Sequence, residues 1–454
     1  MTGREYYTHT KEILRVGLPI MLGQLGIILV GFIDNIMVGH HSTMELGAAS
    51  FVNNFMNLAF IFGLGFSYGL TPLISAAFAG RSDRDRLHLL LSNSLFANGL
   101  VGILLTVIMA IIGFNLHWLG QPVELTEHIL PYYGIQAGSI IIVMLFNAYK
   151  QYADGTDRAT TAMKVMLLSN VINVLLNYLL IFGKFGCPEL GLIGAGLATL
   201  TARIFCLVAM MWLLARRQAG VEKYRPLNSE LVRYNKQAFM HLFKLGTPVA
   251  LQMGVEAASF SLAVIMVGWL GSIALAAHQI IAVISTLGFM FFYGLSSAVT
   301  IRMSRYYEVG DVPKMRATVT TGLTLQLLMA ISFVILLLLT RHIIGRIFTR
   351  DEELVSIVAT LCIPVMVYQF GDVLQILFAN ALRGLRDVTF TAVSAIICHV
   401  PLALGLVYLF AFPLRLGLLG VWMAFPVSLT TLGILLYLRY RHVMRKLENS
   451  MAKA

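Results

Sequence analysis

Long apolar runs separated by short polar segments extend over the whole chain. Twelve of the runs are long enough to cross about 30 Å of hydrocarbon as α-helices, which rise about 1.5 Å per residue. The pattern therefore predicts an all-α polytopic membrane protein with twelve transmembrane helices. We expect these helices at residues 11–38, 46–79, 87–114, 125–150, 160–183, 190–215, 240–269, 273–302, 316–340, 353–381, 388–412 and 417–440.

The longest polar interruption, from Arg216 to Lys236, divides the runs six and six. We therefore expect an N-lobe six-helix bundle over residues 1–215, a cytoplasmic linker over 216–239 and a C-lobe six-helix bundle over 240–454.

The composition excludes a soluble globular protein. Of the 454 residues, 58% are hydrophobic and only 12% are charged, and the mean hydropathy is +0.80. Soluble domains are about 45–50% apolar and about 25% charged. The formal net charge of +11 does not indicate a nucleic-acid partner, because Lys and Arg form short clusters between the apolar runs instead of one basic face.

The Lys and Arg residues instead predict the orientation of the chain. Cytoplasmic loops carry an excess of these residues. If the N-terminus is cytoplasmic, the linker falls on the same side, and the opposite loops hold only Lys184, Arg341, Arg346, Arg350 and Arg415. We therefore place both termini in the cytoplasm and the chain in the bacterial inner membrane. The first apolar run lacks the features of a cleaved signal peptide, so we expect it to remain as a helix.

An internal repeat appears when residues are compared at an offset of 229. The aligned pairs include Gly17–Ile20 with Gly246–Val249, Thr71 with Thr300, and Gly155 with Gly384. An even number of runs separates the two copies, so the repeat is parallel, about an axis along the membrane normal. Two-lobed repeats of this kind support alternating access, so we expect a central cavity and favour a transporter over a duplicated structural scaffold.

Three acidic side chains, Asp34, Glu256 and Asp372, lie inside the apolar runs. A carboxylate in hydrocarbon is costly unless it faces a polar cavity, a cation or a proton. None of the three has an acidic counterpart at the offset of 229. The two lobes therefore carry different sites, each with a predicted role in handling cations or protons.

The first predicted site lies towards the outer side of the N-lobe. Asn173 and Asn177 share one face of the fifth run, at a depth similar to that of Thr199 in the sixth run and Asp34 in the first. One carboxylate with neutral oxygens suits a small cation such as Na⁺, or surrounds a protonatable Asp with hydrogen bonds. Amides that bond packed helices together are the alternative for the asparagines alone.

The second predicted site lies deeper, in the C-lobe. Glu256 is about twelve residues, or roughly 18 Å, from the inner end of its run, and Asp372 is about nine residues, or roughly 14 Å, from the inner end of its own. Tyr368 stands one turn before Asp372 on the same face. Two close carboxylates tend to share a proton, so the pair predicts a site for H⁺ or a cationic substrate. We expect Gln279 to line the same cavity, and the neighbouring His278 to be a packing residue.

Several of these segments resemble one known family over essentially the whole chain. They are Gly17-Leu18-Pro19, Phe32-Ile33-Asp34, Asn173 to Asn177, Phe185 to Gly191, Leu275 to Gln279, Glu256, and Tyr368 with Asp372. The chain resembles a bacterial multidrug and toxic compound extrusion (MATE) transporter of the NorM type.

The resemblance implies efflux of cationic amphipathic drugs by antiport against Na⁺ or H⁺, through alternating access. It also implies an N-lobe cation site at Asp34, Asn173, Asn177 and Thr199. A C-lobe site for cation or proton and substrate is implied at Glu256, Tyr368 and Asp372. Archaeal relatives have an acid where this sequence has Asn177, so their protonation scheme transfers poorly to this chain.

The sequence disfavours three other classes of protein. A flippase for lipid-linked precursors, built on a related superfamily fold, needs basic residues in its cavity, and Arg203 is the only one deep in a run. A membrane enzyme needs a nucleophile or metal ligands, and the pair His40-His41 has no matching carboxylate motif. A channel needs a repeated filter, which is absent from the sequence. We therefore expect a transporter and not an enzyme.

We expect no cofactor apart from the coupling ion, Na⁺ or H⁺. The four cysteines are scattered without metal-like spacing, so the only expected metal is Na⁺ at the two acidic sites. The expected partners are small cationic drugs or toxins and membrane lipid, and we expect a monomer.

Overall fold

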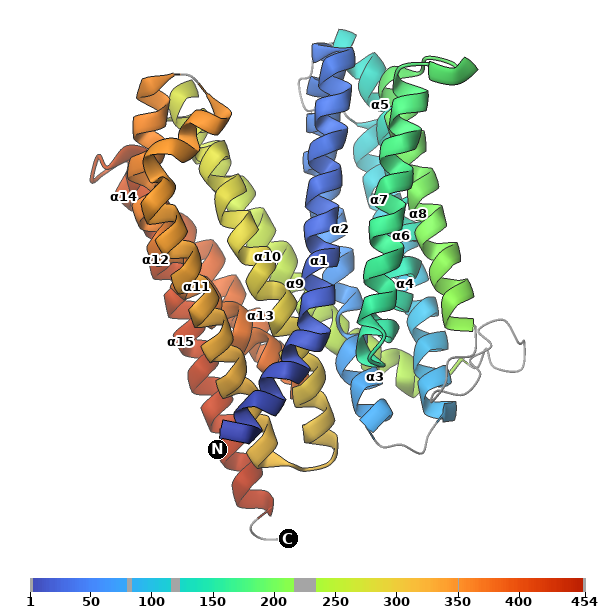
Figure 1. The fold of residues 1–454 in the computed structure, drawn as a ribbon, viewed down its shortest axis with the longest axis vertical. Coiled ribbons are helices and arrows are strands. Elements are labelled where there is room, and N and C mark those ends of the chain that lie inside the picture. Colours follow the sequence, from blue (N-terminus) through green and yellow to red (C-terminus); the bar gives the residue numbers. More distant parts are fainter. Residues whose placement is uncertain (1–2, 80–83, 116–122, 216–233, 350, 452–454) are drawn as a thin grey trace. The chain divides into compact units, whose positions relative to one another are not determined.

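The computed structural model describes residues 3–79, 84–115, 123–215, 234–349 and 351–451 (Figure 1). In this part of the chain, twelve helices are long and apolar enough to cross a membrane, which confirms the predicted all-α fold with twelve spans. Most of the predicted linker, residues 216–233, lies outside the described residues, as does Arg350.

The helices of both halves match the predicted runs closely. In the first half they are α1 (Gly3–His41), α2 (Thr43–Ser67), α3 (Leu70–Ala79), α4 (Arg84–Phe114), α5 (Val123–Gly138), α6 (Ile140–Gly155), α7 (Ala159–Ile181), the short 3-10 helix η2 (Lys184–Gly186) and α8 (Gly191–Ala215). In the second half they are α9 (Lys236–Gly268), α10 (Ser272–Glu308), α11 (Val312–Phe348), α12 (Glu352–Gly384), α13 (Val388–Ile397), η4 (Cys398–Leu404), α14 (Gly405–Ala411) and α15 (Gly417–Met451).

Some spans contain more than one helix. The span Thr43–Ala79 consists of α2 and α3, and Ile129–Gly155 consists of α5 and α6. The span Val388–Ala411 passes through η4, a π-helix that contains Pro401. Proline lacks the N–H that an α-helix needs at each interior position, which accounts for a local change of helix type there.

Polar residues between the apolar runs begin the next helix. Ser42 accepts a hydrogen bond from the backbone N–H of Glu45 at the start of α2, and Asp351 accepts one from Glu353 at the start of α12. These caps satisfy N–H groups that have no partner inside the helix. Gly271, immediately before α10, has a φ of 108°, a conformation that residues with a Cβ rarely adopt.

The predicted repeat is visible in equivalent hydrogen bonds. Thr71 donates to the side-chain oxygen of Gln151 over 2.8 Å, and Thr300 donates to the side-chain oxygen of Asn380 over 3.0 Å. Each residue of the second pair stands 229 positions after its counterpart in the first. The two halves of the sequence therefore fold alike at these positions.

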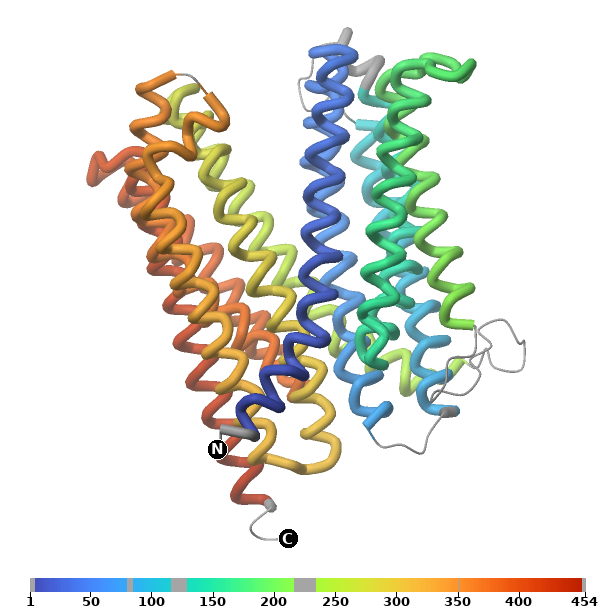
Figure 2. Tube along the Cα trace, viewed as in Figure 1, coloured from blue at the N-terminus to red at the C-terminus, as the bar shows by residue number. Residues whose placement is uncertain are grey.

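The chain divides into two compact units that exchange the first parts of two helices. Unit 1 contains Met1–Met21 and Leu251–Ala454, and unit 2 contains Leu22–Ala250. The divisions fall inside α1 and inside α9, and they are 229 positions apart. Figure 2 shows α1, in blue, as one uninterrupted helix through its division point. The predicted lobe boundaries follow the sequence repeat, and they stay a prediction.

Glycines allow the exchanged segments to pack closely. A Cβ added to Gly65 of α2 would lie 2.9 Å from the Cα atom of Ala250 in α9. A Cβ added to Gly294 of α10 would lie 2.8 Å from the Cα atom of Met21 in α1. These two contacts are again equivalent under the offset of 229. The exchange is therefore reciprocal: each unit holds the start of the first helix of the other repeat.

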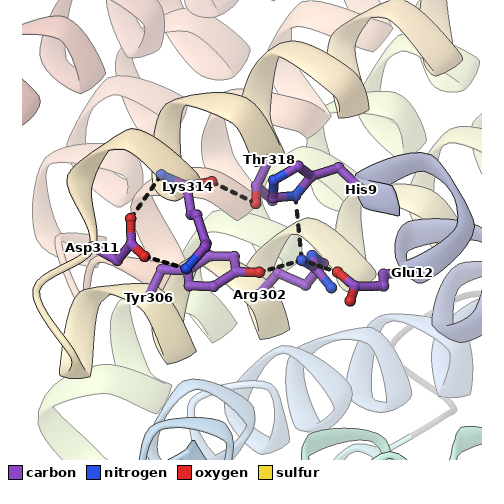
Figure 3. Close-up of polar contacts among 7 residues, drawn as sticks. All are labelled: His9, Glu12, Arg302, Tyr306, Asp311, Lys314 and Thr318. Atoms are coloured by element: carbon purple, nitrogen blue, oxygen red, sulfur yellow. Dashed lines mark hydrogen bonds and ion pairs between the residues drawn. The ribbon is translucent and has the colours of Figure 1, made fainter. Parts of the chain in front are cut away.

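Arg302 of α10 fastens the first part of α1 within unit 1 (Figure 3). Its guanidinium forms an ion pair with Glu12, lies 3.3 Å from the Nδ1 atom of His9 and donates to the hydroxyl of Tyr306. Arg302 and His9 are both buried, whereas Glu12 is partly exposed. This polar contact has no counterpart at the offset of 229, where Leu73 replaces Arg302.

The same close-up shows how α11 begins. Asp311 accepts hydrogen bonds from the backbone N–H and from the ammonium group of Lys314, over 3.1 and 2.6 Å. Burial raises the pKa of Asp311, but these hydrogen bonds and the charge of Lys314 outweigh burial and hold the pKa below its ordinary value. Thr318 donates to the backbone oxygen of Lys314 one turn into the helix.

Candidate functional site

The predicted N-lobe residues form one hydrogen-bonded chain in unit 2. The side-chain amide of Asn177 donates to a carboxylate oxygen of Asp34 over 2.5 Å and to the side-chain oxygen of Asn173 over 3.1 Å. Asn173 in turn donates to the hydroxyl of Thr199 over 3.2 Å. The chain joins α1, α7 and α8, so the structure brings together all four residues of the predicted site.

The helical spacing of α7 explains this arrangement. Asn173 and Asn177 are four residues apart, so their side chains lie on one face of the helix. Both are buried, and Asp34 is half-buried. The side-chain oxygen of Asn177 has no hydrogen-bond partner among the described residues, and the nitrogen of the same amide is the atom that contacts Asp34. Carboxylate and amide oxygens are suitable ligands for a small hard cation.

The predicted C-lobe residues lie in unit 1. Asp372 of α12 is fully buried, and neither of its carboxylate oxygens has a hydrogen-bond partner among the described residues. Glu256 of α9 interacts with it electrostatically, and both acids interact with the buried phenol of Tyr368. The structure thus places these three side chains in one neighbourhood. An acid that is buried in this way is costly as a bare carboxylate and needs a proton or a cation.

A glutamine that the sequence analysis did not identify completes this cluster. Gln375 of α12 donates from its side-chain amide to a carboxylate oxygen of Glu256 over 2.8 Å, and its own side-chain oxygen has no partner in the described part of the chain. It stands three residues after Asp372, so both side chains lie on neighbouring parts of one helical face. This hydrogen bond fixes Glu256 of α9 against α12.

Gln279 and His278 of α10, both considered in the sequence analysis, differ in their exposure. Gln279 is exposed and makes no hydrogen bond with Glu256, Tyr368 or Asp372 among the described residues. The reason is its place on the helix, because its neighbours His278 and Ile280 are the buried ones. The ring of His278 packs 5.3 Å from the ring of Trp422, as expected for a packing residue.

A buried histidine that the sequence analysis missed also lies near the C-lobe acids. His399 belongs to the π-helix η4, and its Nε2 atom has no hydrogen-bond partner among the described residues. Its backbone oxygen accepts a hydrogen bond from Ser259 over 2.6 Å, one turn after Glu256 on α9. The only sequence signal was a histidine two residues before Pro401 within an apolar run.

Comparison with known proteins identifies the family. The family model described as MatE matches residues 19–179 and again residues 248–409. The two matches begin 229 positions apart, which is the offset of the repeat. The chain belongs to the MatE family. This result confirms the resemblance to the MATE family.

A curated member of the MatE family is similar over nearly the whole chain. The probable multidrug resistance protein NorM of Rhizobium meliloti (strain 1021) is 29% identical over 450 residues, which cover 98% of this chain and 96% of that protein. Since the MatE family is one of transporters, the match supports a protein that is not an enzyme.

Solved structures share the fold. A crystal structure of MATE in complex with MaL6 has a TM-score of 0.86 at 20% identity and covers 97% of both chains. The eukaryotic MATE transporter AtDTX14 has a TM-score of 0.86 at 18% identity and covers 98% of this chain and 99% of its own. At these identities the similarity establishes the MatE fold alone.

Proposed function

We propose that this protein exports cationic amphipathic compounds by antiport against Na⁺ or H⁺. The observation that carries the proposal is Asp372, a fully buried acid in a membrane span to which none of the described residues donates a hydrogen bond. Such a group holds a proton, a metal cation or an organic cation, and binding one displaces another. Competition for the acid couples the inward flow of an ion to the outward flow of the drug.

We assign different ligands to the two acidic clusters. The Asp34 cluster offers a carboxylate with amide and hydroxyl oxygens close by, which suits a small coupling ion. The Glu256 cluster offers two acids that interact with Tyr368, whose ring packs against that of Trp422, and this arrangement suits a larger organic cation as well as a proton. The similarity to a probable multidrug resistance protein supports a drug as the cargo.

We place the protein in the bacterial inner membrane as a monomer with both termini in the cytoplasm. The excess of Lys and Arg on one side of the predicted topology supports this orientation. Figure 1 agrees in one respect, because α1 begins and α15 ends at the same end of unit 1.

Ethidium efflux from proteoliposomes tests the proposal. The full-length protein is assayed first under an imposed Na⁺ gradient and then under an imposed pH gradient, together with Asp34→Asn, Glu256→Gln and Asp372→Asn. The control is Glu352→Gln, which removes a carboxylate whose side chain is 71% exposed at the start of α12. We expect Asp34→Asn, Glu256→Gln and Asp372→Asn to lose gradient-driven efflux and the control to keep it. If all three variants pump like the parent under both gradients, the proposal is wrong.

A further inference from the structure

A half-buried arginine, Arg203, lies in the middle of a membrane span of unit 2. Arg203 of α8 donates to the side-chain oxygen of Gln136 over 2.7 Å and to the hydroxyl of Ser139. The guanidinium also lies 4.6 Å from the centre of the Phe60 ring. All of these groups are uncharged, and Arg203 forms no ion pair within the described part of the chain.

The neutral groups around Arg203 form a connected network. Gln136 donates to the hydroxyl of Tyr132 over 2.9 Å, and Tyr132 donates to the side-chain oxygen of Asn53 over 3.2 Å. Gln136, Ser139 and Tyr132 are buried. These dipoles solvate the guanidinium but leave its positive charge uncancelled. A charge held inside a membrane in this way acts on other charged groups over a longer range than it does in water.

The negatively charged group with which Arg203 interacts in this unit is the Asp34 carboxylate. Thr199, the last residue of the Asp34 chain, stands four residues before Arg203 and so lies one turn away on the same face of α8. Asp34 and Arg203 interact electrostatically without forming an ion pair. Amide and hydroxyl groups therefore separate a fixed negative charge from a fixed positive one.

We propose that Arg203 is a built-in counter-charge of the Asp34 site and sets how tightly that site holds the coupling cation. The inference rests on the ion-coupled function proposed above. A cation at Asp34 is repelled by the guanidinium, so it binds more weakly than it does at an isolated carboxylate and leaves more readily. When the site is empty, Arg203 balances the charge of Asp34, which lowers the cost of holding the empty site inside the membrane.

Two variants remove the free positive charge in different ways. Arg203→Gln deletes the charge, whereas Gln136→Glu keeps the arginine and places a carboxylate where an oxygen already accepts its hydrogen bond. Arg203→Lys keeps the charge but loses the planar fork of donors. The measured quantity is the concentration of the coupling cation, Na⁺ or H⁺, that gives half-maximal ethidium efflux in proteoliposomes. Thermal stabilisation of the purified protein by the same cation is a second measurement that needs no transport.

We expect Arg203→Gln and Gln136→Glu to lower the half-maximal cation concentration roughly tenfold, as expected for removal of a repelling charge nearby. We expect Arg203→Lys to keep a half-maximal cation concentration close to that of the parent. We expect the maximal efflux rate of Arg203→Gln and Gln136→Glu to fall, because the cation is released more slowly. A merely structural role predicts lower thermal stability in all three variants with an unchanged cation requirement, and that result overturns the inference.

Asp34→Asn separates the two proposals. If it loses its dependence on the cation while Arg203→Gln and Gln136→Glu keep the half-maximal concentration of the parent, the counter-charge role fails and the ion-coupled function stands. If Asp34→Asn keeps the full cation dependence of the parent, the Asp34 site is not the coupling site and the counter-charge role fails, whereas the antiport proposal then rests on Glu256 and Asp372.

Discussion

Asn177 donates a 2.5 Å hydrogen bond to Asp34, although the two residues are 143 positions apart and belong to different helices. Asn177 is fully buried, whereas Asp34 is half-buried. The contact orients one carboxylate oxygen of Asp34 and leaves the rest of the carboxylate available to an ion. Asn177 therefore both supports the fold of unit 2 and shapes its candidate cation site.

Asn177→Leu is expected to destabilise the protein and weaken its response to the coupling cation. The substitution leaves the half-buried Asp34 without its donor, which costs about 1–3 kcal/mol. Thermal unfolding of the detergent-purified protein, with and without Na⁺, measures both effects. The matched control is Asn170→Leu, on the same face of α7, where no hydrogen bond of the side chain is present among the described residues. Equal losses in the two variants would contradict a special role of Asn177.

Gln375→Leu is expected to weaken the binding of a cationic drug. The substitution removes the amide that holds Glu256 of α9 in place, and a hydrogen bond to a charged group contributes about 1.5–3 kcal/mol. A tenfold or larger increase in the Kd for ethidium, measured by fluorescence polarisation, follows from the lower end of that range.

The control for Gln375 is Gln326→Leu, which removes a buried hydrogen bond to Ser296 in the same unit. We expect this control to lower thermal stability and leave the Kd for ethidium unchanged. If Gln375→Leu keeps the parent's Kd for ethidium, Gln375 takes no part in drug binding.

The sequence predicted the spans and the Asp34 cluster because both follow from one-dimensional rules. Hydropathy over some twenty residues identifies a span, and the spacing of Asn173 and Asn177 places them on one helical face. The sequence analysis did not identify Gln375. A neutral amide in an apolar run costs much less free energy than an acid, so it is not an obvious candidate for function. Its role depends on how α9 packs against α12, which the sequence pattern does not specify.

The exchange of half-helices between the units also escaped sequence reasoning. Gly17 lies against Leu295 and Gly246 lies against Phe66, so each glycine packs on the copy of the repeat to which it does not belong. Leu295 and Phe66 occupy equivalent positions of the repeat. Because both copies offer an apolar partner of similar kind, the sequence pattern is the same for packing within a copy and for packing across copies.

Gly384→Ala is expected to destabilise unit 1 through overpacking. A Cβ at Gly384 would lie 2.6 Å from the Cβ of Met303 and 2.9 Å from the backbone oxygen of Thr300, closer than atoms pack without movement. Forcing a methyl group into such a contact costs about 1–3 kcal/mol. Thermal unfolding in detergent measures the loss. Gly405→Ala is the control, since a Cβ there meets nothing within 4 Å, and the prediction fails if both variants unfold at the same temperature.

Glu12 and Arg302 are expected to show a coupling energy in a double-mutant cycle. Glu12→Gln, Arg302→Gln and the double variant are compared by thermal unfolding at low and high salt. The side chain of Arg302 is only 9% exposed, but that of Glu12 is 43% exposed, so solvent screens the pair and we expect a coupling of about 0.5–1 kcal/mol that falls with salt. Additive effects of the two substitutions would show that the ion pair does not fasten α1 to α10.

Competition between ions and drug for the acids of the membrane spans is the central claim, and equilibrium binding tests it most directly. The Kd for ethidium is measured on the purified protein while Na⁺ replaces choline at constant pH and ionic strength, and then while pH falls at constant Na⁺. The account predicts that the Kd rises with at least one of the two cations and that Asp372→Asn abolishes this dependence. A Kd that is the same at every Na⁺ concentration and every pH would contradict the account.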